Sequence, residues 1–144
     1  GLAAGLLILL AACAPPAPPT EAADPSPEPS YSPMAFGHTE QVAARGQATE
    51  TMRAYAQPEV GANAWWAEVS PHLSAAAQTA YAGTDPGVIP ARRITGPATV
   101  TPASLPALAR VAVPTDAGIY LVLLSRTPGQ PWVVERIIPP ERVH

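Results

Sequence analysis

The stretch that decides the fold is residues 107–138, ALARVAVPTDAGIYLVLLSRTPGQPWVVERII. It contains three segments rich in branched and aromatic residues, 107–113, 119–126 and 132–138, separated by connections that contain Pro and Gly. Such segments are typical of β-strands, and connections this short join neighbouring antiparallel strands. We therefore predict an antiparallel meander, preceded by a fourth candidate strand at 92–101.

Residue parity, counted across simple hairpins, divides this meander into two faces. One face is predicted to pack on helices and carries a single carboxylate among apolar residues: Ala109, Val111, Val113, Ile119, Leu121, Leu123, Val133, Glu135 and Ile137. The other is a semi-apolar face with arginines, and so a candidate partner surface. Its residues are Leu108, Arg110, Tyr120, Val122, Leu124, Arg126, Trp132, Val134 and Arg136.

Helical signals precede the strands. Residues 39–57 are rich in Ala, with apolar residues at helical intervals and Pro58 as a stop. Gly46 weakens the middle, so we expect either one kinked helix or a frayed first half, with 47–56 secure. Asn63 is a candidate N-cap for a second helix, and Ser70 with Pro71 is a candidate start for a third.

The order of three helices and a four-stranded curved meander resembles the NTF2-like cone fold, in the variant of TcpC and VirB8 type conjugation proteins. The motifs Trp65-Trp66 with Ser70-Pro71, YAGTDP at 81–86 and VPTDAG at 113–118 are similar to those of uncharacterised actinobacterial membrane-anchored proteins. The resemblance covers residues 39–144 and implies an α+β cone. Because function does not follow from fold, it implies no particular chemistry.

The amino-terminal residues indicate export. Residues 1–12 are uncharged and apolar, which suits the h-region of a signal peptide whose basic n-region would lie upstream of Gly1. Leu10-Ala11-Ala12-Cys13 resembles a bacterial lipobox. That resemblance implies a diacylglyceryl group on Cys13 and cleavage just before it, and hence an address on the extracytoplasmic face of the cell membrane. The alternatives are the end of an uncleaved transmembrane helix, or a buried core helix.

Residues 14–38 follow as a predicted disordered tether. Eight prolines lie among the twenty residues from Ala14 to Pro33, with few large apolar groups, so the segment cannot bury enough surface to offset its ordering entropy. A spacer is the favoured interpretation, and a ligand for a proline-recognition module is the alternative. The remaining domain, 39–144, holds eight acids and eight arginines. This balance gives no electrostatic footprint for nucleic acid.

Motifs for chemistry are scarce. A single cysteine excludes an intramolecular disulfide and multi-cysteine zinc sites, and His38, His72 and His144 lack the spacing of metal ligands. No Gly-rich phosphate loop or Gly-x-Ser-x-Gly motif is present. We therefore expect no metal, no cofactor and no enzymatic activity.

Six residues remain as candidates for ligand or partner contact: Glu135, Trp65, Trp66, Tyr81, Arg110 and Arg136. Glu135 inside a cone, with Tyr81 and Asp85 at the rim, could serve as a general base; the alternatives are an error in strand register or pairing with a nearby Arg. Adjacent helical residues point about 100° apart, so one of Trp65 and Trp66 is expected in the core and the other at the mouth of the cone.

Two functional hypotheses follow. The first is a non-catalytic envelope protein, a protein-interaction or assembly module that docks a partner or itself through the sheet. The second is a small-ligand-binding or isomerase-like domain that uses the cone interior around Glu135. A deep pocket containing Glu135 and a Tyr would favour the second.

Overall fold

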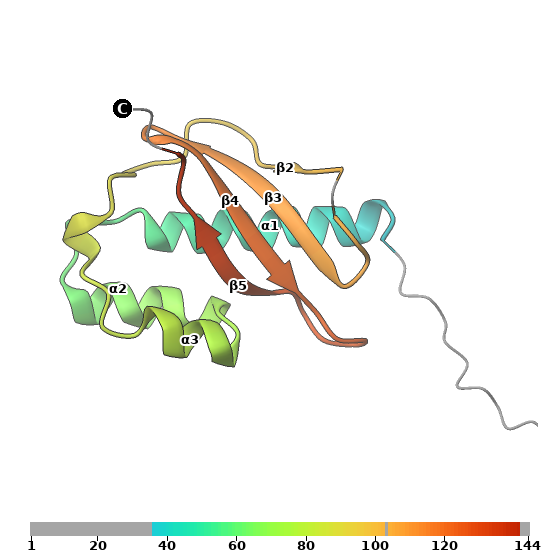
Figure 1. Cartoon of the computed structure of the whole chain (residues 1–144), viewed down its shortest axis with the longest axis horizontal. Coiled ribbons are helices and arrows are strands. Elements are labelled where there is room, and N and C mark those ends of the chain that lie inside the picture. The colour runs from blue at the N-terminus through green and yellow to red at the C-terminus, as the bar shows by residue number, and fades with distance from the viewer. Residues whose placement is uncertain (1–35, 103, 142–144) are drawn as a thin grey trace, which may run out of the picture. The chain divides into compact units, whose positions relative to one another are not determined.

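The computed structural model of the chain describes residues 36–102 and 104–141. In this part three α-helices precede four antiparallel strands, so the predicted α+β class is correct (Figure 1). Residues 1–35, with Cys13 and most of the predicted tether, lie outside the described residues. The tether was predicted to reach residue 38, but the chain packs earlier. Phe36 meets Trp132 edge to face with ring centroids 6.0 Å apart, and the first helix begins at His38.

Helix α1 (His38–Tyr55) is the longest element and lies along one face of the sheet (Figure 1). Its start is stabilised by Glu40, whose Oε1 accepts a hydrogen bond from the Gly37 backbone N–H at 2.9 Å. Ala44, Ala48 and Met52 recur at helical intervals on its buried face. The helix continues through Gly46, so its first half is not frayed, because an exposed glycine weakens a helix without ending it.

The second helical region contains α2 (Ala62–Val69), a 3-10 turn η1 (Ser70–His72) and α3 (Ala75–Tyr81). Gly61 precedes α2 as the N-cap, and Asn63, the predicted cap, lies inside the helix. Ser70-Pro71 starts only the 3-10 turn, because Leu73 is extended and bridges to Val134. The cap of α3 is Ser74, whose Oγ accepts a hydrogen bond from Ala77 N–H at 3.1 Å. Gly83 follows with φ +82°, the conformation expected after a helix end.

The sheet is the predicted meander, with strand order β2-β3-β4-β5 and every pair antiparallel. Its strands are β2 (Thr99–Val100), β3 (Leu108–Thr115), β4 (Gly118–Ser125) and β5 (Val133–Ile138). The strands cross α1, while α2 and α3 lie toward the β5 side (Figure 1).

The first predicted strand, 92–101, is much shorter in the structure. Only Thr99 and Val100 form strand, with an isolated bridge from Ile94 to Thr115. Pro97 lacks an N–H for a sheet ladder and follows Gly96, which prevents a continuous strand. Upstream, the Asp116 carboxylate accepts the backbone N–H groups of Arg92 and Arg93 at 2.8 and 3.3 Å. These bonds, led by the one from Arg92, lower the pKa of Asp116.

The two faces of the sheet differ from the parity prediction. The buried face, which packs on the helices, carries Ala109, Val111 and Val113 of β3 opposite Leu124, Val122 and Tyr120 of β4, all at most 1% exposed. Trp132, Val134 and Ile137 complete it. The prediction is therefore correct for β3 and Ile137 and wrong for β4, Trp132 and Val134, because Tyr120, Val122 and Leu124 were assigned to the open face.

The β3–β4 turn explains this error. Thr115 pairs with Gly118, so only Asp116 and Ala117 form the loop, whereas the prediction began the connection at Pro114. Gly118 has φ +114°, which suits the end of such a tight turn. A one-residue difference in register moves every side chain of the second strand to the opposite face.

Candidate functional site

The face of the sheet away from α1, here called the outer face, exposes large apolar side chains. Leu108 and Ile119 are 54% and 58% exposed, and Leu105, in the loop before β3, is 57% exposed. Leu121 and Leu123 of β4 are half-buried and alternate with the fully buried Val122. The outer face was predicted to be semi-apolar, and it is, although its β4 residues are Ile119, Leu121 and Leu123.

Two arginines lie among these apolar groups. In the strand register Arg110 of β3 and Arg136 of β5 are both partners of Leu123 on β4, so their Cα atoms are roughly 10 Å apart, twice the spacing between strands. Both side chains are exposed. Neither guanidinium forms an ion pair or a hydrogen bond with any residue that the structure describes. The ion pairs in this part of the chain join Arg53 to Glu50 and Arg92 to Glu59.

Glu135 lies on this outer side and not in a cone interior. The register shifts between Leu123 and Leu124, whose partners are Arg136 and Val134, so Glu135 is the extra residue of a β-bulge. Its Oε1 accepts a hydrogen bond from Ser74 Oγ at 2.7 Å and its Oε2 accepts one from Ser125 Oγ at 2.5 Å. The carboxylate is thus held between α3 and β4 by two hydroxyl donors.

A hollow of about 400 Å³ opens beside Glu135 and is called the outer hollow. It is lined by apolar residues and one group of each charge: Leu105, Leu108, Ala109, Arg110, Leu123, Leu124 and Glu135. None of the described tyrosines lines it. Tyr81, the expected companion of Glu135, has a different partner.

Tyr81 covers the free edge of β5. Its hydroxyl accepts a hydrogen bond from Ile137 N–H at 2.8 Å and donates one to Ile137 C=O at 3.2 Å, so it replaces a neighbouring strand. Ser74 N–H adds a third contact, to Val134 C=O at 2.9 Å. The contact of Tyr81 is therefore with the backbone of its own sheet, and it protects that edge from pairing with another chain.

One of the two adjacent tryptophans lies in the core, as their spacing predicted. Trp65 is 1% exposed, and its Nε1 donates a hydrogen bond to Tyr55 C=O at 2.9 Å. Trp66 is half-buried beside it, with ring centroids 6.3 Å apart. Trp65 thus ties α2 to the end of α1, and only Trp66 presents part of its ring to solvent.

A second hollow, of about 670 Å³, lies where the end of α1 meets the β3–β4 turn and the segment after β5; we call it the tyrosine cavity. Its lining is mostly apolar: Tyr55, Thr84, Val88, Ile89, Pro90, Ala117, Tyr120, Pro139, Pro140 and Glu141. The Tyr55 ring contacts those of Trp65 and Tyr120 at 5.7 and 6.1 Å between centroids. Burial, then the neighbouring Tyr120 and Tyr81, raise the pKa of Tyr55 to about 12.

The sequence did not point to this cavity. Tyr120 was assigned to the open face, and Tyr55 lies within the helix predicted at 39–57, where it was given no further role. The signal that could have found it is the pair Thr115 and Gly118 closing a two-residue turn, because this pairing sends Tyr120 toward α1.

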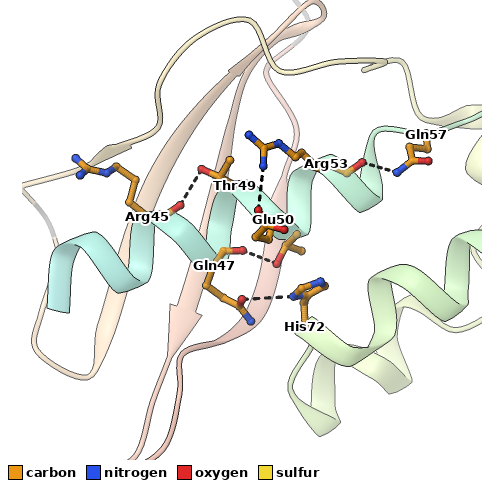
Figure 2. Close-up of polar contacts among 8 residues, drawn as sticks. Arg45, Gln47, Thr49, Glu50, Arg53, Gln57 and His72 are labelled. Atoms are coloured by element: carbon orange, nitrogen blue, oxygen red, sulfur yellow. Dashed lines mark hydrogen bonds and ion pairs between the residues drawn. The ribbon is translucent and has the colours of Figure 1, made fainter. Parts of the chain in front are cut away.

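The polar side of α1 borders two further hollows, one of about 560 Å³ whose lining includes Arg53, Arg92 and Arg93, and one of about 360 Å³ whose lining includes Glu40 and Arg126. Figure 2 shows its contacts, which are mostly within the helix: Arg53 with Glu50 at 2.9 Å, Thr49 with Arg45 C=O, and Gln57 with Arg53 C=O. His72 Nδ1 lies 3.4 Å from Gln47 Oε1 and links η1 to α1 (Figure 2). Among residues 36–102 and 104–141, no group of three His, Cys, Asp or Glu side chains is placed to hold a metal ion.

Comparisons with known proteins give one result. No family model, curated protein or solved structure matches the chain. The resemblances to a lipobox and to the NTF2-like fold therefore stay predictions from the residues. Within the described part of the chain, no helix has the length and apolar character needed to cross a membrane.

Proposed function

We propose that this protein is a non-catalytic protein-interaction module of the bacterial cell envelope, which docks an acidic, amphipathic partner protein on its outer face. The observation that carries the proposal is the combination of exposed Leu105, Leu108 and Ile119 with two arginines that have no ion-pair partner among the described residues. Exposed apolar groups around unpaired charges are typical of an interaction surface.

The partner would bind through side chains on the face and not by extending the sheet. At one edge β2 is only two residues long, and at the other the β5 backbone is occupied by Ser74 and Tyr81. Neither edge offers the long row of free N–H and C=O groups that strand addition needs. The outer hollow, about 400 Å³ in volume, is large enough for one apolar side chain of the partner.

The charges favour acidic groups on the partner. Arg110 and Arg136 flank Leu123, so carboxylates roughly 10 Å apart would complement them. If a second copy of the chain docked on the outer face through its own outer face, arginines would lie against arginines, and this repulsion costs free energy. A non-catalytic role is supported by Glu135, whose two oxygens are both engaged by serine hydroxyls.

The docking proposal is tested by photo-crosslinking in the native host. A photoreactive side chain at Leu108 is expected to give one discrete adduct, whose partner peptide, identified by mass spectrometry, is acidic and apolar. The double change Arg110→Glu, Arg136→Glu should lower its yield at least fivefold. Arg45→Glu with Arg53→Glu, on the far side of α1, is the matched control and should leave the yield unchanged.

Two outcomes contradict this proposal. One is an equal adduct from a probe at Ala67, an exposed residue of α2. The other is an adduct insensitive to the arginine reversal. An adduct of the chain with itself would show that the outer face binds a second copy of the chain and not an acidic partner.

We further propose that Cys13 carries a lipid that holds the module on the extracytoplasmic face of the membrane. The support is the lipobox-like sequence 10–13 and the proline-rich residues after it. Replacement of Cys13 by Ser should abolish metabolic labelling by an alkyne fatty acid and release the protein to the medium. Unchanged membrane retention of the variant would instead indicate an uncleaved helix as anchor.

The NTF2-like cone is our proposal for the finer fold. It is supported by the order of three helices and a four-stranded antiparallel meander with α1 across one face. An experimental structure of the full chain tests it, since a flat sheet that does not curve around α1 would exclude the cone.

A further inference from the structure

We infer that the tyrosine cavity binds a small, neutral, largely apolar molecule that accepts a hydrogen bond from the Tyr55 hydroxyl. This inference is independent of the docking proposal, because Tyr55 and the residues of the outer hollow lie in separate linings.

The size and walls of the cavity suit such a ligand. About 670 Å³ falls inside the range of roughly 300–1,000 Å³ typical of small-molecule sites. Its walls come from four separate parts of the chain: the end of α1, residues 84–90, the β3–β4 turn and the segment after β5. The last two are in tight contact, because a Cβ on Gly118 would lie 2.8 Å from Pro140 Cγ. The wall is therefore built by packing.

Tyr55 supplies the polar group that orients the ligand. Its hydroxyl forms no hydrogen bond with any residue that the structure describes, while its ring is fixed between Trp65 and Tyr120. A phenol is protonated at neutral pH, and burial raises the pKa of Tyr55 further, to about 12, so its hydroxyl is a hydrogen-bond donor there. By contrast, the Thr84 hydroxyl is already used, since it donates to Tyr81 C=O at 2.6 Å.

The charges around the cavity select a neutral ligand. Among residues 36–102 and 104–141, its lining contains no Arg, Lys or His, so a carboxylate or phosphate would find no cation among them. Glu141, which is exposed, is the one carboxylate among the described lining residues and further disfavours anions. A carbonyl or ether oxygen on an apolar, ring-containing body satisfies both the phenol donor and the apolar wall.

The test uses the fluorescent ketone Prodan, a neutral naphthalene with one carbonyl, titrated against the full chain. Binding is expected to shift its emission to the blue and to raise its intensity. Tyr55→Phe removes only the hydroxyl and should weaken binding about fivefold, the worth of one neutral hydrogen bond. Val88→Trp, at a position 70% exposed on the cavity rim, should obstruct the mouth and weaken binding at least twentyfold.

Leu108→Trp is the matched control, because it places the same bulky ring in the outer hollow and should leave Prodan affinity unchanged. Urea unfolding of each variant confirms that the fold is retained; Val88→Trp, at an exposed residue, keeps the test informative if Tyr55→Phe is unstable. Absence of a blue shift in the wild type overturns the inference. So does equal loss of affinity in Leu108→Trp and Val88→Trp.

Discussion

The inner and outer faces of the sheet are made by the same strands and differ in what covers them. In β4, Tyr120, Val122 and Leu124 are at most 1% exposed beneath the helices, while Ile119 on the other face is 58% exposed. Both faces are apolar, so hydrophobicity alone does not tell core from interaction surface. The difference lies in the charges: Arg110, Arg136 and Glu135 all lie on the outer side.

The two hollows repeat this contrast. The tyrosine cavity, next to the helices, has the Tyr55 phenol among its polar groups, and burial raises the pKa of this phenol to about 12. The outer hollow is lined by Arg110 and Glu135, which water reaches. Because a charge out of water is costly unless it is paired, an apolar ligand suits the first site and a charged partner surface the second.

The largest expected effect separates the two faces directly. Val122→Glu puts a carboxylate in the core at a residue with 0% exposure, and we expect a loss of at least about 4 kcal/mol in the free energy of unfolding, enough to unfold the domain. Ile119→Glu, three residues earlier on the outer face, should change it by about 0.5 kcal/mol or less. Urea denaturation followed by circular dichroism gives both values. If the two changes destabilised the protein equally, Ile119 would be buried like Val122, and the outer face would not be exposed to solvent.

The sequence was sufficient to predict the class, the helical regions, the strands of the meander and their order. These depend on local features: branched and aromatic residues in short segments, apolar residues at helical intervals, and Pro58 after α1. It was not sufficient for the register. The turn at 114–118 contains both Pro114 and Gly118, and composition does not show whether the loop has two residues or more. The structure places Pro114 inside β3 and pairs Thr115 with Gly118.

The residues of the candidate site could not be placed without this register. Arg110 was assigned to the open face correctly, because β3 precedes the turn. Glu135 was misplaced, because its position depends on the β3–β4 register and on the bulge beside Leu124, and a bulge has no reliable signature in the residues around it. Tyr81 was expected at the rim of a cone as a companion of Glu135, but it bonds to Ile137 instead, and these hydrogen bonds depend on the path of Leu73 and Ser74 along β5.

Gly118 offers a way to disturb the tyrosine cavity while leaving the outer hollow intact. Gly118→Ala introduces a side chain at φ +114° and within 2.8 Å of Pro140, so we expect a loss of about 2–3 kcal/mol in stability and a shifted wall after β5. Urea denaturation measures the first effect, and weaker Prodan binding reports the second. Stability equal to that of the wild type would show that the segment carrying Pro140 moves freely.

The pH dependence of stability tests whether Tyr55 is buried. Its folded-state pKa of about 12 exceeds the ordinary value near 10, so the native state keeps its proton where the unfolded state loses it. The stabilisation is complete below pH 10 and is lost as pH rises toward 12, by about 1–2 kcal/mol after allowance for partial exposure. The free energies of unfolding of the wild type and of Tyr55→Phe, measured by urea denaturation at pH 9 to 12, differ by this contribution. If their difference did not change with pH, the Tyr55 phenol would be exposed to water.

The smallest effect belongs to Gly46, on the exposed side of α1, away from both hollows. A Cβ there would meet nothing within 4 Å, and its backbone is helical, so Gly46→Ala should stabilise the protein by about 0.5–1 kcal/mol through the lower entropy of the unfolded chain. Thermal denaturation should show a rise of a few degrees in Tm. At Gly118 the change to Ala is expected to lower the stability instead, because both the φ angle and the space there are unsuitable for a side chain. If Gly46→Ala were destabilising, α1 would be distorted at this position, and the kink expected from the sequence would have a physical basis.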